Sequence, residues 1–414
     1  MPVFPGVRRD PARPVRPSFR DPRFALLLAG QSLGWVCSWA SGIVLWGFAA
    51  YHFGASPESI SVTALCWSGP PVVLTAFTGG LTDRFGPRTM LIIGYACSAA
   101  TSLGMTTAGS LMSLDIMAVA CGAARSVCSP ASSTLPTRVV EPGDLLAANS
   151  LLGVTASIGQ VGGPLAASVL MAVAGFRAAF AADAAMYLVN ALVVIPLPNL
   201  PRPDESGTAD TGRSAHAVSW LRKATAGAVT VARDPALRRV ALARMGVIFT
   251  SGAFLVIEPL YARHVLGRPP SQFALFEAAI GAGAIVTGLA LPVIRRRLPA
   301  ARSAGTVLAA GAIGYGLAAA LFAGTPWIPV AYLGAFVWGV SGTVFYAVAA
   351  TTLQRLAPAK ALGRVAGVIS TAESTVENVS MPLAGMLIAG VGIRSGALIL
   401  AAVAVAAGTA CLRG

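Results

Sequence analysis

Two glutamates, Glu373 and Glu377, lie one helical turn apart inside a long apolar run of the sequence, with Asn378 beside them. Placing a charge at the centre of a membrane-spanning helix costs about 2.5 to 3.5 kcal/mol, so such residues usually mark a function. Two carboxylates at this spacing in a low dielectric resist ionising together. This chemistry suits a proton carrier or a site for a cationic substrate. The alternatives are neutralisation by a cation such as Arg125, or a polar cavity wall.

Four further ionisable residues fall inside apolar runs. Asp183, Glu258 and Glu277 lie toward the outer ends of their runs, where they could line an extracellular mouth. Of these, Asp183 is the best second candidate for proton coupling. Arg125 is the one cation predicted well inside a run, and a lone buried guanidinium needs a carboxylate or a substrate anion as its partner. Arg125 therefore joins the proton-coupling candidates.

Polar, acidic and aromatic side chains of the runs are candidates to line a substrate cavity. The candidates are Gln31, Trp35, Trp39, Gln160, Tyr346, Asn378, Glu258 and Glu277. A cavity built mainly from small apolar residues and scattered aromatics carries little hydrogen-bond specificity. The expected partner is therefore an amphipathic small molecule of unspecified identity.

The elements that position these residues are membrane spans. The chain has 414 residues, of which 55% are hydrophobic and 11% are charged, whereas soluble domains are about 25% charged. Apolar runs of about 20 residues, the length that crosses the hydrocarbon core, recur along the chain. The sequence predicts an all-α membrane protein with twelve transmembrane helices at 24–51, 60–78, 89–109, 113–135, 145–174, 178–198, 238–261, 272–294, 303–323, 328–353, 363–391 and 394–412.

Basic residues set the predicted orientation. Most of the 30 Lys and Arg residues fall in segments that are cytoplasmic if both termini are cytoplasmic, and the group at 202–244 is counted among them. By the positive-inside rule this predicts a multi-pass protein of the cell membrane with both ends inside. The net charge of +14 is spread over short loops, so anionic lipid headgroups are the expected partner and nucleic acid is not.

A degenerate internal repeat predicts two halves. Arg20-Asp21-Pro22 precedes the first run, and Arg233-Asp234-Pro235 precedes the seventh. Duplicated halves of six helices are typical of transporters that rock around a midplane site. The predicted organisation is a cytoplasmic tail at 1–22, a six-helix bundle at 23–198, a linker with an amphipathic helix at 199–236, and a second six-helix bundle at 237–414.

The segment after the second run combines glycines and charges: Gly79, Leu81, Thr82, Asp83, Arg84, Gly86 and Arg88. This pattern resembles the loop signature of the major facilitator superfamily, with Pro87 at a position where that family usually has a cation. Gly79 and Gly80 would allow close helix contact, and Gly86 would take a positive φ in a tight turn. The resemblance implies a latch in which Asp83 receives the N-terminal end of the helix at Gly363-Arg364. The alternative is that the charges only orient the hairpin.

Gly159, Gly163 and Pro164 form a second pattern, which resembles the antiporter motif of drug exporters in the same superfamily. The alternative is ordinary packing of small residues. Together with neighbouring segments, the pattern resembles the drug:proton antiporter branch of macrolide-efflux and siderophore exporters. This implies export of a small molecule by proton antiport with alternating access. The alternatives are import of a metabolite by symport or uniport, and a non-transporting receptor or lipid-flipping scaffold.

Enzymatic functions are not expected. The sequence has no Walker loop for ATP, no zinc-type histidine spacing and no nucleophile elbow. We therefore expect no cofactor and no metal, and an ion gradient as the energy source. The expected partners are the substrate and protons, and the expected state is a monomer.

Overall fold

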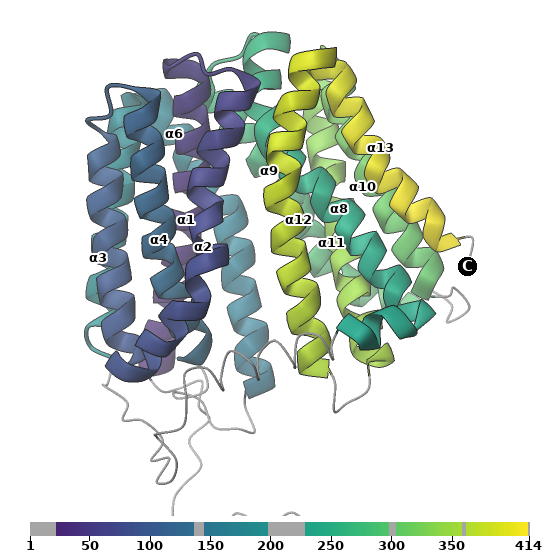
Figure 1. The fold of residues 1–414 in the computed structure, drawn as a ribbon, viewed down its shortest axis with the longest axis horizontal. Coiled ribbons are helices and arrows are strands. Elements are labelled where there is room, and N and C mark those ends of the chain that lie inside the picture. The colour runs from purple at the N-terminus through teal and green to yellow at the C-terminus, as the bar shows by residue number, and fades with distance from the viewer. Residues whose placement is uncertain (1–21, 136–144, 198–227, 298–303, 358–361, 413–414) are drawn as a thin grey trace, which may run out of the picture.

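The computed structural model describes residues 22–135, 145–197, 228–297, 304–357 and 362–412, and a minority of the side chains within these ranges are not described. In these ranges all regular structure is helical, and the helices stand side by side in two groups (Figure 1). This confirms the predicted all-α membrane fold. The predicted tail at 1–22 lies almost wholly outside the described residues, as does most of the linker at 199–236, where 228–233 and the first two residues of α8 are helical.

The first group of helices holds the N-terminal part of the chain. Its elements are α1 (Pro22–Gly47), the π-helical segment η2 (Phe48–His52), α2 (Pro57–Phe85), α3 (Pro87–Met105), α4 (Leu111–Thr134) and α6 (Leu145–Val194). The second group consists of α8 (Pro235–Leu260), η3 (Tyr261–Val265), α9 (Pro270–Arg297), α10 (Ala304–Gly324), α11 (Ile328–Leu356), α12 (Leu362–Val391) and α13 (Ile393–Leu412). Gly175, at φ 77°, divides α6 into two helical runs.

The predicted spans match the helices to within a few residues, with one exception. The span at 60–78 was predicted to end before a loop, but α2 continues as a helix to Phe85. The hydroxyl of Thr82 donates to the Thr78 carbonyl, and the Gly86 amide donates to the Thr82 carbonyl. The second of these bonds continues the backbone ladder of the helix, so charges in this segment do not interrupt the helix, and the turn is confined to Gly86.

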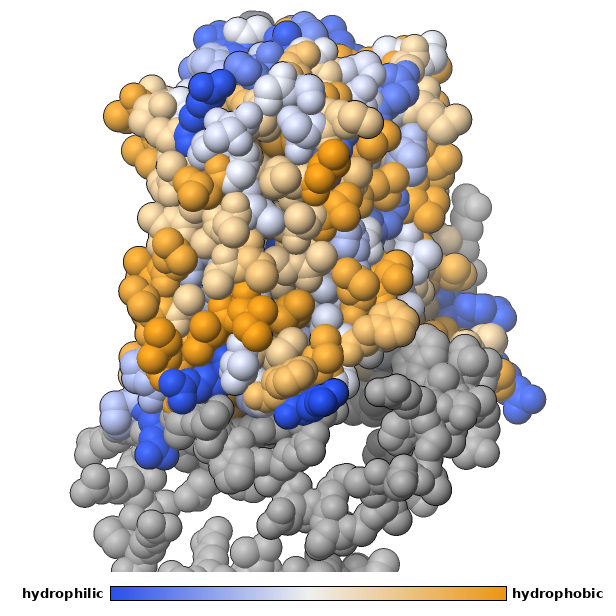
Figure 2. All heavy atoms as spheres, turned by 60° about the vertical axis from the view of Figure 1, so that its left-hand side comes forward, coloured by the Kyte–Doolittle hydropathy of each residue, from blue (hydrophilic) through white to orange (hydrophobic). Residues whose placement is uncertain are grey.

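Eight helical stretches of the described chain are long and apolar enough to cross a membrane by themselves. The helices α2, α3 and α12 are not among them. Of these, α2 and α12 pack on each other across the two groups, and polar residues of both find partners at this contact. Figure 2 shows the lipid-facing counterpart, a broad hydrophobic band with hydrophilic residues above and below it.

The internal repeat is visible in the backbone. Helix α1 with η2 and helix α8 with η3 have the same length and are related by an offset of 213 residues. Each begins at a proline and ends in a π-helical turn. Gly54 and Gly267, which follow at the same offset, both adopt positive φ values of 63° and 60°. The predicted domain boundaries remain a proposal.

Candidate functional site

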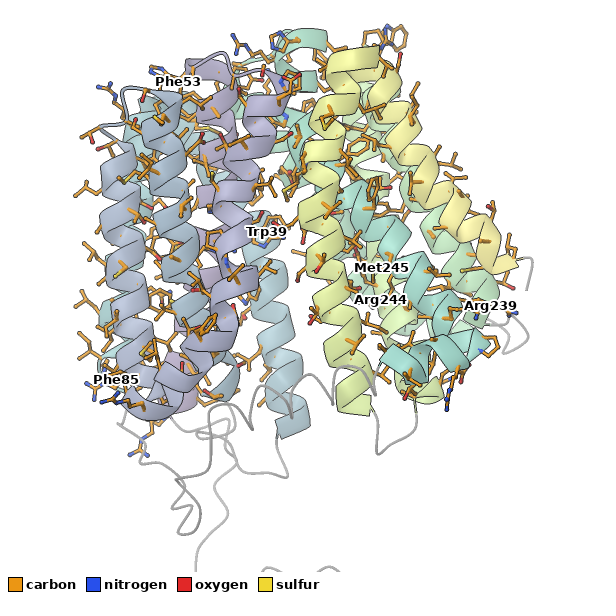
Figure 3. All side chains as sticks on the ribbon, in the orientation of Figure 1. Trp39, Phe53, Phe85, Arg239, Arg244 and Met245 are labelled. Atoms are coloured by element: carbon orange, nitrogen blue, oxygen red, sulfur yellow. The ribbon has the colours of Figure 1, made fainter. Side chains whose placement is uncertain are left out.

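The two groups of helices contact each other near one end of the molecule. We call the end that carries Phe53 the outer end and the end that carries Phe85 the inner end (Figure 3), after the orientation predicted from the basic residues. Toward the outer end, Ser61 of α2 donates to the Met381 carbonyl of α12 at 3.0 Å. Ser168 of α6 donates to the Ser271 carbonyl of α9 at 2.8 Å. These bonds join the halves at the outer end.

Toward the inner end the same helices leave open space. A Cβ added at Gly79 or Gly80 of α2, or at Gly367 of α12, would meet no atom within 4 Å. The Phe77 side chain of α2 is 70% exposed. In this conformation Gly79 and Gly80 therefore make no close helix contact with the described residues, contrary to the prediction.

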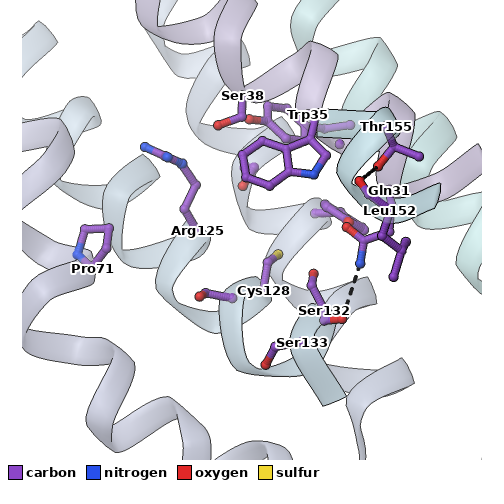
Figure 4. A pocket seen from close by; sticks show the side chains of 15 residues that line it. Gln31, Trp35, Ser38, Pro71, Arg125, Cys128, Ser132, Ser133, Leu152 and Thr155 are labelled. Atoms are coloured by element: carbon purple, nitrogen blue, oxygen red, sulfur yellow. Dashed lines mark hydrogen bonds between the residues drawn. The ribbon is translucent and has the colours of Figure 1, made fainter. Parts of the chain in front are cut away.

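The N-terminal half lines an open cavity of about 620 Å³ among α1, α2, α3, α4 and α6. Of the predicted cavity residues, Gln31 and Trp35 line it, and Arg125 does as well. Gln31 donates to the Ser132 carbonyl at 3.3 Å (Figure 4). Trp39 is not one of the lining residues, and the side chain of Gln160 lies outside the described part. The rest of the wall is rich in hydroxyl groups, from Ser38, Tyr95, Ser98, Ser129, Ser132, Ser133, Thr155 and Tyr187.

Arg125 extends from α4 toward this cavity (Figure 4). Its guanidinium carbon lies 3.7 Å from the centre of the Trp67 ring, which covers one face of the cation. Nη1 of Arg125 is buried and has no hydrogen-bond partner. Trp67 was not anticipated from the sequence, since nothing in its spacing distinguishes it from a packing tryptophan.

In the C-terminal half, Glu373 of α12 forms an ion pair with Arg244 of α8. Nε of Arg244 lies 2.5 Å from Oε1 of Glu373, and both side chains are 15% exposed. Arg244 also lies over the ring of Tyr346, at 5.8 Å. Two predictions are therefore wrong: Arg244 does not belong with the cytoplasmic cations, and Arg125 is not the one cation inside a helix bundle. The alternative that Arg125 neutralises Glu373 is also not what the structure shows.

The repeat contained the signal that would have found Arg244. At the offset of 213 residues, Arg244 occupies the position in α8 that Gln31 occupies in α1. Because Gln31 is a cavity candidate, the repeat predicts that Arg244 also lies inside a helix bundle. The positive charge of Arg244 and its closeness to the basic linker instead placed it among the cytoplasmic cations.

Glu377 and Asn378 lie at the contact of α12 with its neighbours. Glu377 has no ion-pair partner among the described residues. A Cβ added at Gly252 of α8 would lie 2.7 Å from the Glu377 carbonyl, so α8 approaches α12 closely here. Asn378 accepts a hydrogen bond at 2.7 Å from Ser68 of α2, in the other half. Asn378 thus links the halves.

Asp183 does not line an extracellular mouth, as had been predicted. Its side chain is 2% exposed, and Ser41 of α1 and Ser102 of α3 each donate to its Oδ2 at 2.7 Å. Its Oδ1 atom has no partner. A carboxyl group inside a bundle requires such donors, and the hydroxyls of α1 and α3 draw this face of α6 inward.

Glu258 and Glu277 are also buried and do not line a mouth. They are 4% and 7% exposed, and the two carboxyl groups are close enough to interact electrostatically. One carboxyl oxygen of Glu258 is buried and has no hydrogen-bond partner among the described residues. The sequence placed both near the outer interface, but α8 and α9 turn them toward each other inside the second half.

The signature segment is described only in part. Gly86 has φ 83°, which confirms the predicted positive φ, and Pro87 follows as the first residue of α3, a favoured position for proline. The Arg84 guanidinium lies 5.3 Å from the Phe85 ring centre, and Nε of Arg88 is buried without a partner. The side chains of Asp83 and Arg364 lie outside the described part, so the latch stays a prediction.

The glycines of the second pattern pack α6 on α1. A Cβ added at Gly159 would collide with Trp35, and one added at Gly163 would lie 2.6 Å from Cβ of Trp39. Pro164 is buried beside them. This contact lets the two helix backbones approach closely. Its role in antiport stays a prediction.

Comparisons with known proteins agree on one family. The profile of the Major Facilitator Superfamily matches residues 26–376. An uncharacterized MFS-type transporter of Bacillus subtilis, YfiS, is 24% identical over 387 residues, which cover 91% of this chain and 90% of that protein. An uncharacterized MFS-type transporter of Mycobacterium tuberculosis, Rv0037c, is 30% identical over 323 residues, or 72% of this chain and 69% of that protein.

Solved structures show the same fold. The nucleoside transporter NupG aligns with a TM-score of 0.75 at 14% identity, covering 94% of this chain and 99% of that one. The peptide transporter POT aligns with a TM-score of 0.75 at 12% identity, covering 94% and 93%. At these identities the likeness concerns the fold alone. The matched profile, the repeated helical halves and the charged groups inside them place this chain in the Major Facilitator Superfamily, as a multi-pass membrane transporter.

Proposed function

We propose that this chain exports an amphipathic small molecule across the cell membrane in exchange for protons, by alternating access between its two halves. The observation that carries the proposal is the composition of α12. This helix holds Glu373 and Glu377, and the adjacent Asn378 forms a hydrogen bond to α2 of the other half. The titratable groups and a contact between the halves therefore share one rigid element.

Protonation of Glu373 would act on the ion pair. A neutral carboxyl group loses most of its attraction for the Arg244 guanidinium. The ion pair of Arg244 with Glu373 joins α8 to α12. Weakening that bond frees α12 to shift against α8. Because α12 also contacts α2, such a shift would reach the interface that changes during alternating access.

Glu377 supports the same scheme from a different position. It lies one turn further toward the outer end and has no ion-pair partner among the residues described. A proton that leaves one carboxyl group therefore has a second carboxyl group within one helical turn. The pair would load protons from one side and release them to the other as the halves rock.

The cavity of the N-terminal half supports an amphipathic substrate. Its volume of about 620 Å³ falls in the range of small-molecule sites. The Trp35 side chain is 42% exposed and offers a flat apolar surface, and hydroxyl groups supply most of the polar lining. A cavity of this kind can bind apolar groups of different shapes at Trp35 and can form hydrogen bonds with the polar groups of a substrate.

The test uses inverted membrane vesicles with an imposed pH gradient, acidic inside. A transported compound should collapse the gradient in wild-type vesicles, and Glu373→Gln and Glu377→Gln should each abolish the response. Glu58→Gln is the matched control, because Glu58 is an exposed carboxylate at the start of α2. A response that survives both α12 substitutions, or uptake into whole cells in place of export, would refute the proposal.

A further inference from the structure

The cavity in the N-terminal half contains one cation and no acidic side chain among its lining residues. The cation is Arg125. The remaining polar lining consists of hydroxyl groups, one thiol and the amide of Gln31. A guanidinium without an ion-pair partner in a region of low dielectric strongly attracts an anion.

Two hydrogen-bond donors of the cavity wall also lack partners in the described part of the chain and could serve an anion. Among the described residues, neither the buried Nη1 of Arg125 nor the buried hydroxyl oxygen of Ser98 has a hydrogen-bond partner. Buried donors without a partner are rare in folded proteins and need an explanation. A ligand oxygen that accepts from both groups would supply one.

Glu377 of the other half interacts electrostatically with Arg125, but no ion pair joins the two among the described residues. Asp183 belongs to the same half as Arg125, but it accepts its hydrogen bonds from Ser41 and Ser102. In the described residues the one ion pair is Arg244 with Glu373, in the other half. Arg125 is thus not neutralised within its own half.

The surroundings of Arg125 also define the shape of a ligand. Trp67 covers one face of the guanidinium at 3.7 Å, which holds the fork in place and leaves its edge for a planar anion. Across the cavity, the exposed Trp35 ring offers a surface for an apolar or aromatic body (Figure 4). The two features lie in one cavity, so a single molecule can use both.

We infer that the N-terminal cavity binds the anionic group of an amphipathic molecule at Arg125, with the apolar body of that molecule against Trp35. The carboxylate, sulfonate or phosphate monoester of an aromatic compound has this chemistry. This inference deepens the proposed function by naming the substrate class, but it concerns binding alone. It holds whether or not transport is coupled to protons.

The test measures dye binding to the purified full-length protein in a neutral maltoside detergent by fluorescence anisotropy. Fluorescein, an anionic xanthene, is compared with rhodamine 123, a cationic xanthene of similar size. We expect fluorescein to bind at least tenfold more tightly than rhodamine 123. We expect Arg125→Gln to raise the Kd for fluorescein at least tenfold. Arg125→Lys should retain part of it, because the charge remains while the planar fork is lost.

Arg177→Gln is the matched control, since Arg177 is an exposed cation outside the cavity; it should leave fluorescein affinity unchanged. A competition measurement on the wild-type protein tests the inference even if Arg125→Gln misfolds. In it, benzenesulfonate should displace fluorescein, and benzylammonium should not. Addition of phosphatidylglycerol separates the two sources of anion. Displacement by this lipid alone, equal binding of both dyes, or full fluorescein affinity in Arg125→Gln would each overturn the inference of a small-molecule anion.

Discussion

The ion pair between Arg244 and Glu373 allows the most direct test of the site. The perturbation is a set of three variants: Glu373→Gln, Arg244→Gln and the double substitution. Glutamine keeps the approximate length of each side chain and removes its charge. The comparison therefore isolates the interaction between the two charges.

The magnitude follows from burial. Exposed ion pairs contribute about 0 to 1 kcal/mol, and breaking a fully buried pair by removing one partner costs about 3 to 5 kcal/mol. Both side chains here are 15% exposed, so we expect each single variant to lower the free energy of unfolding by about 2 to 3 kcal/mol. Glu373→Gln should be the milder one, because Arg244 keeps its position over the Tyr346 ring.

The double variant decides whether the charges act as a pair. It leaves no unpaired charge, so its loss should be smaller than the sum of the single losses by at least about 1 kcal/mol. The assay is unfolding in mixed micelles of maltoside and graded SDS, followed by tryptophan fluorescence, with Glu58→Gln as the control. Single effects that add to within about 0.5 kcal/mol would refute the assigned coupling.

Two further predictions concern the signature segments. Gly163→Leu should unfold at a clearly lower SDS fraction in the same assay, because its Cβ would lie 2.6 Å from that of Trp39 and α6 would have to move off α1. Gly390→Leu, at a position with open space, should have little effect, and equal effects of both would contradict this packing argument. Asp83→Asn should express normally yet lose most transport in the vesicle assay, as the latch requires, whereas near-normal transport would remove the latch.

The positions of the helices could be predicted from the sequence to within a few residues in most cases. Membrane spans are long and uniformly apolar, so hydrocarbon thickness alone defines them, and most predicted boundaries agree with the helices. The misplaced boundary is at the end of α2, where Gly79, Asp83 and Arg84 suggested a loop. Helix propensity is a weak preference, and hydrogen bonding along the backbone continued to Phe85.

The partners of the charged residues depended on the direction in which each helix face turns. Asp183, Glu258 and Glu277 were assigned to a mouth from their depth along a helix. Depth follows from counting residues, but the direction of a side chain follows from packing against other helices. Ser41 and Ser102 turn Asp183 into the first half, and no feature of the chain near Asp183 encodes those two hydroxyls.

By itself, the sequence determined the membrane class, the helical repeat and the list of residues able to carry charge, because these follow from composition and from spacing along the chain. Only the tertiary structure decided that Arg244, not Arg125, pairs with Glu373, and that Arg125 faces a cavity without an acid. The physical reason is that an ion pair forms over a few ångströms in space. Residues 129 positions apart in the sequence reach that distance only when α8 and α12 pack together.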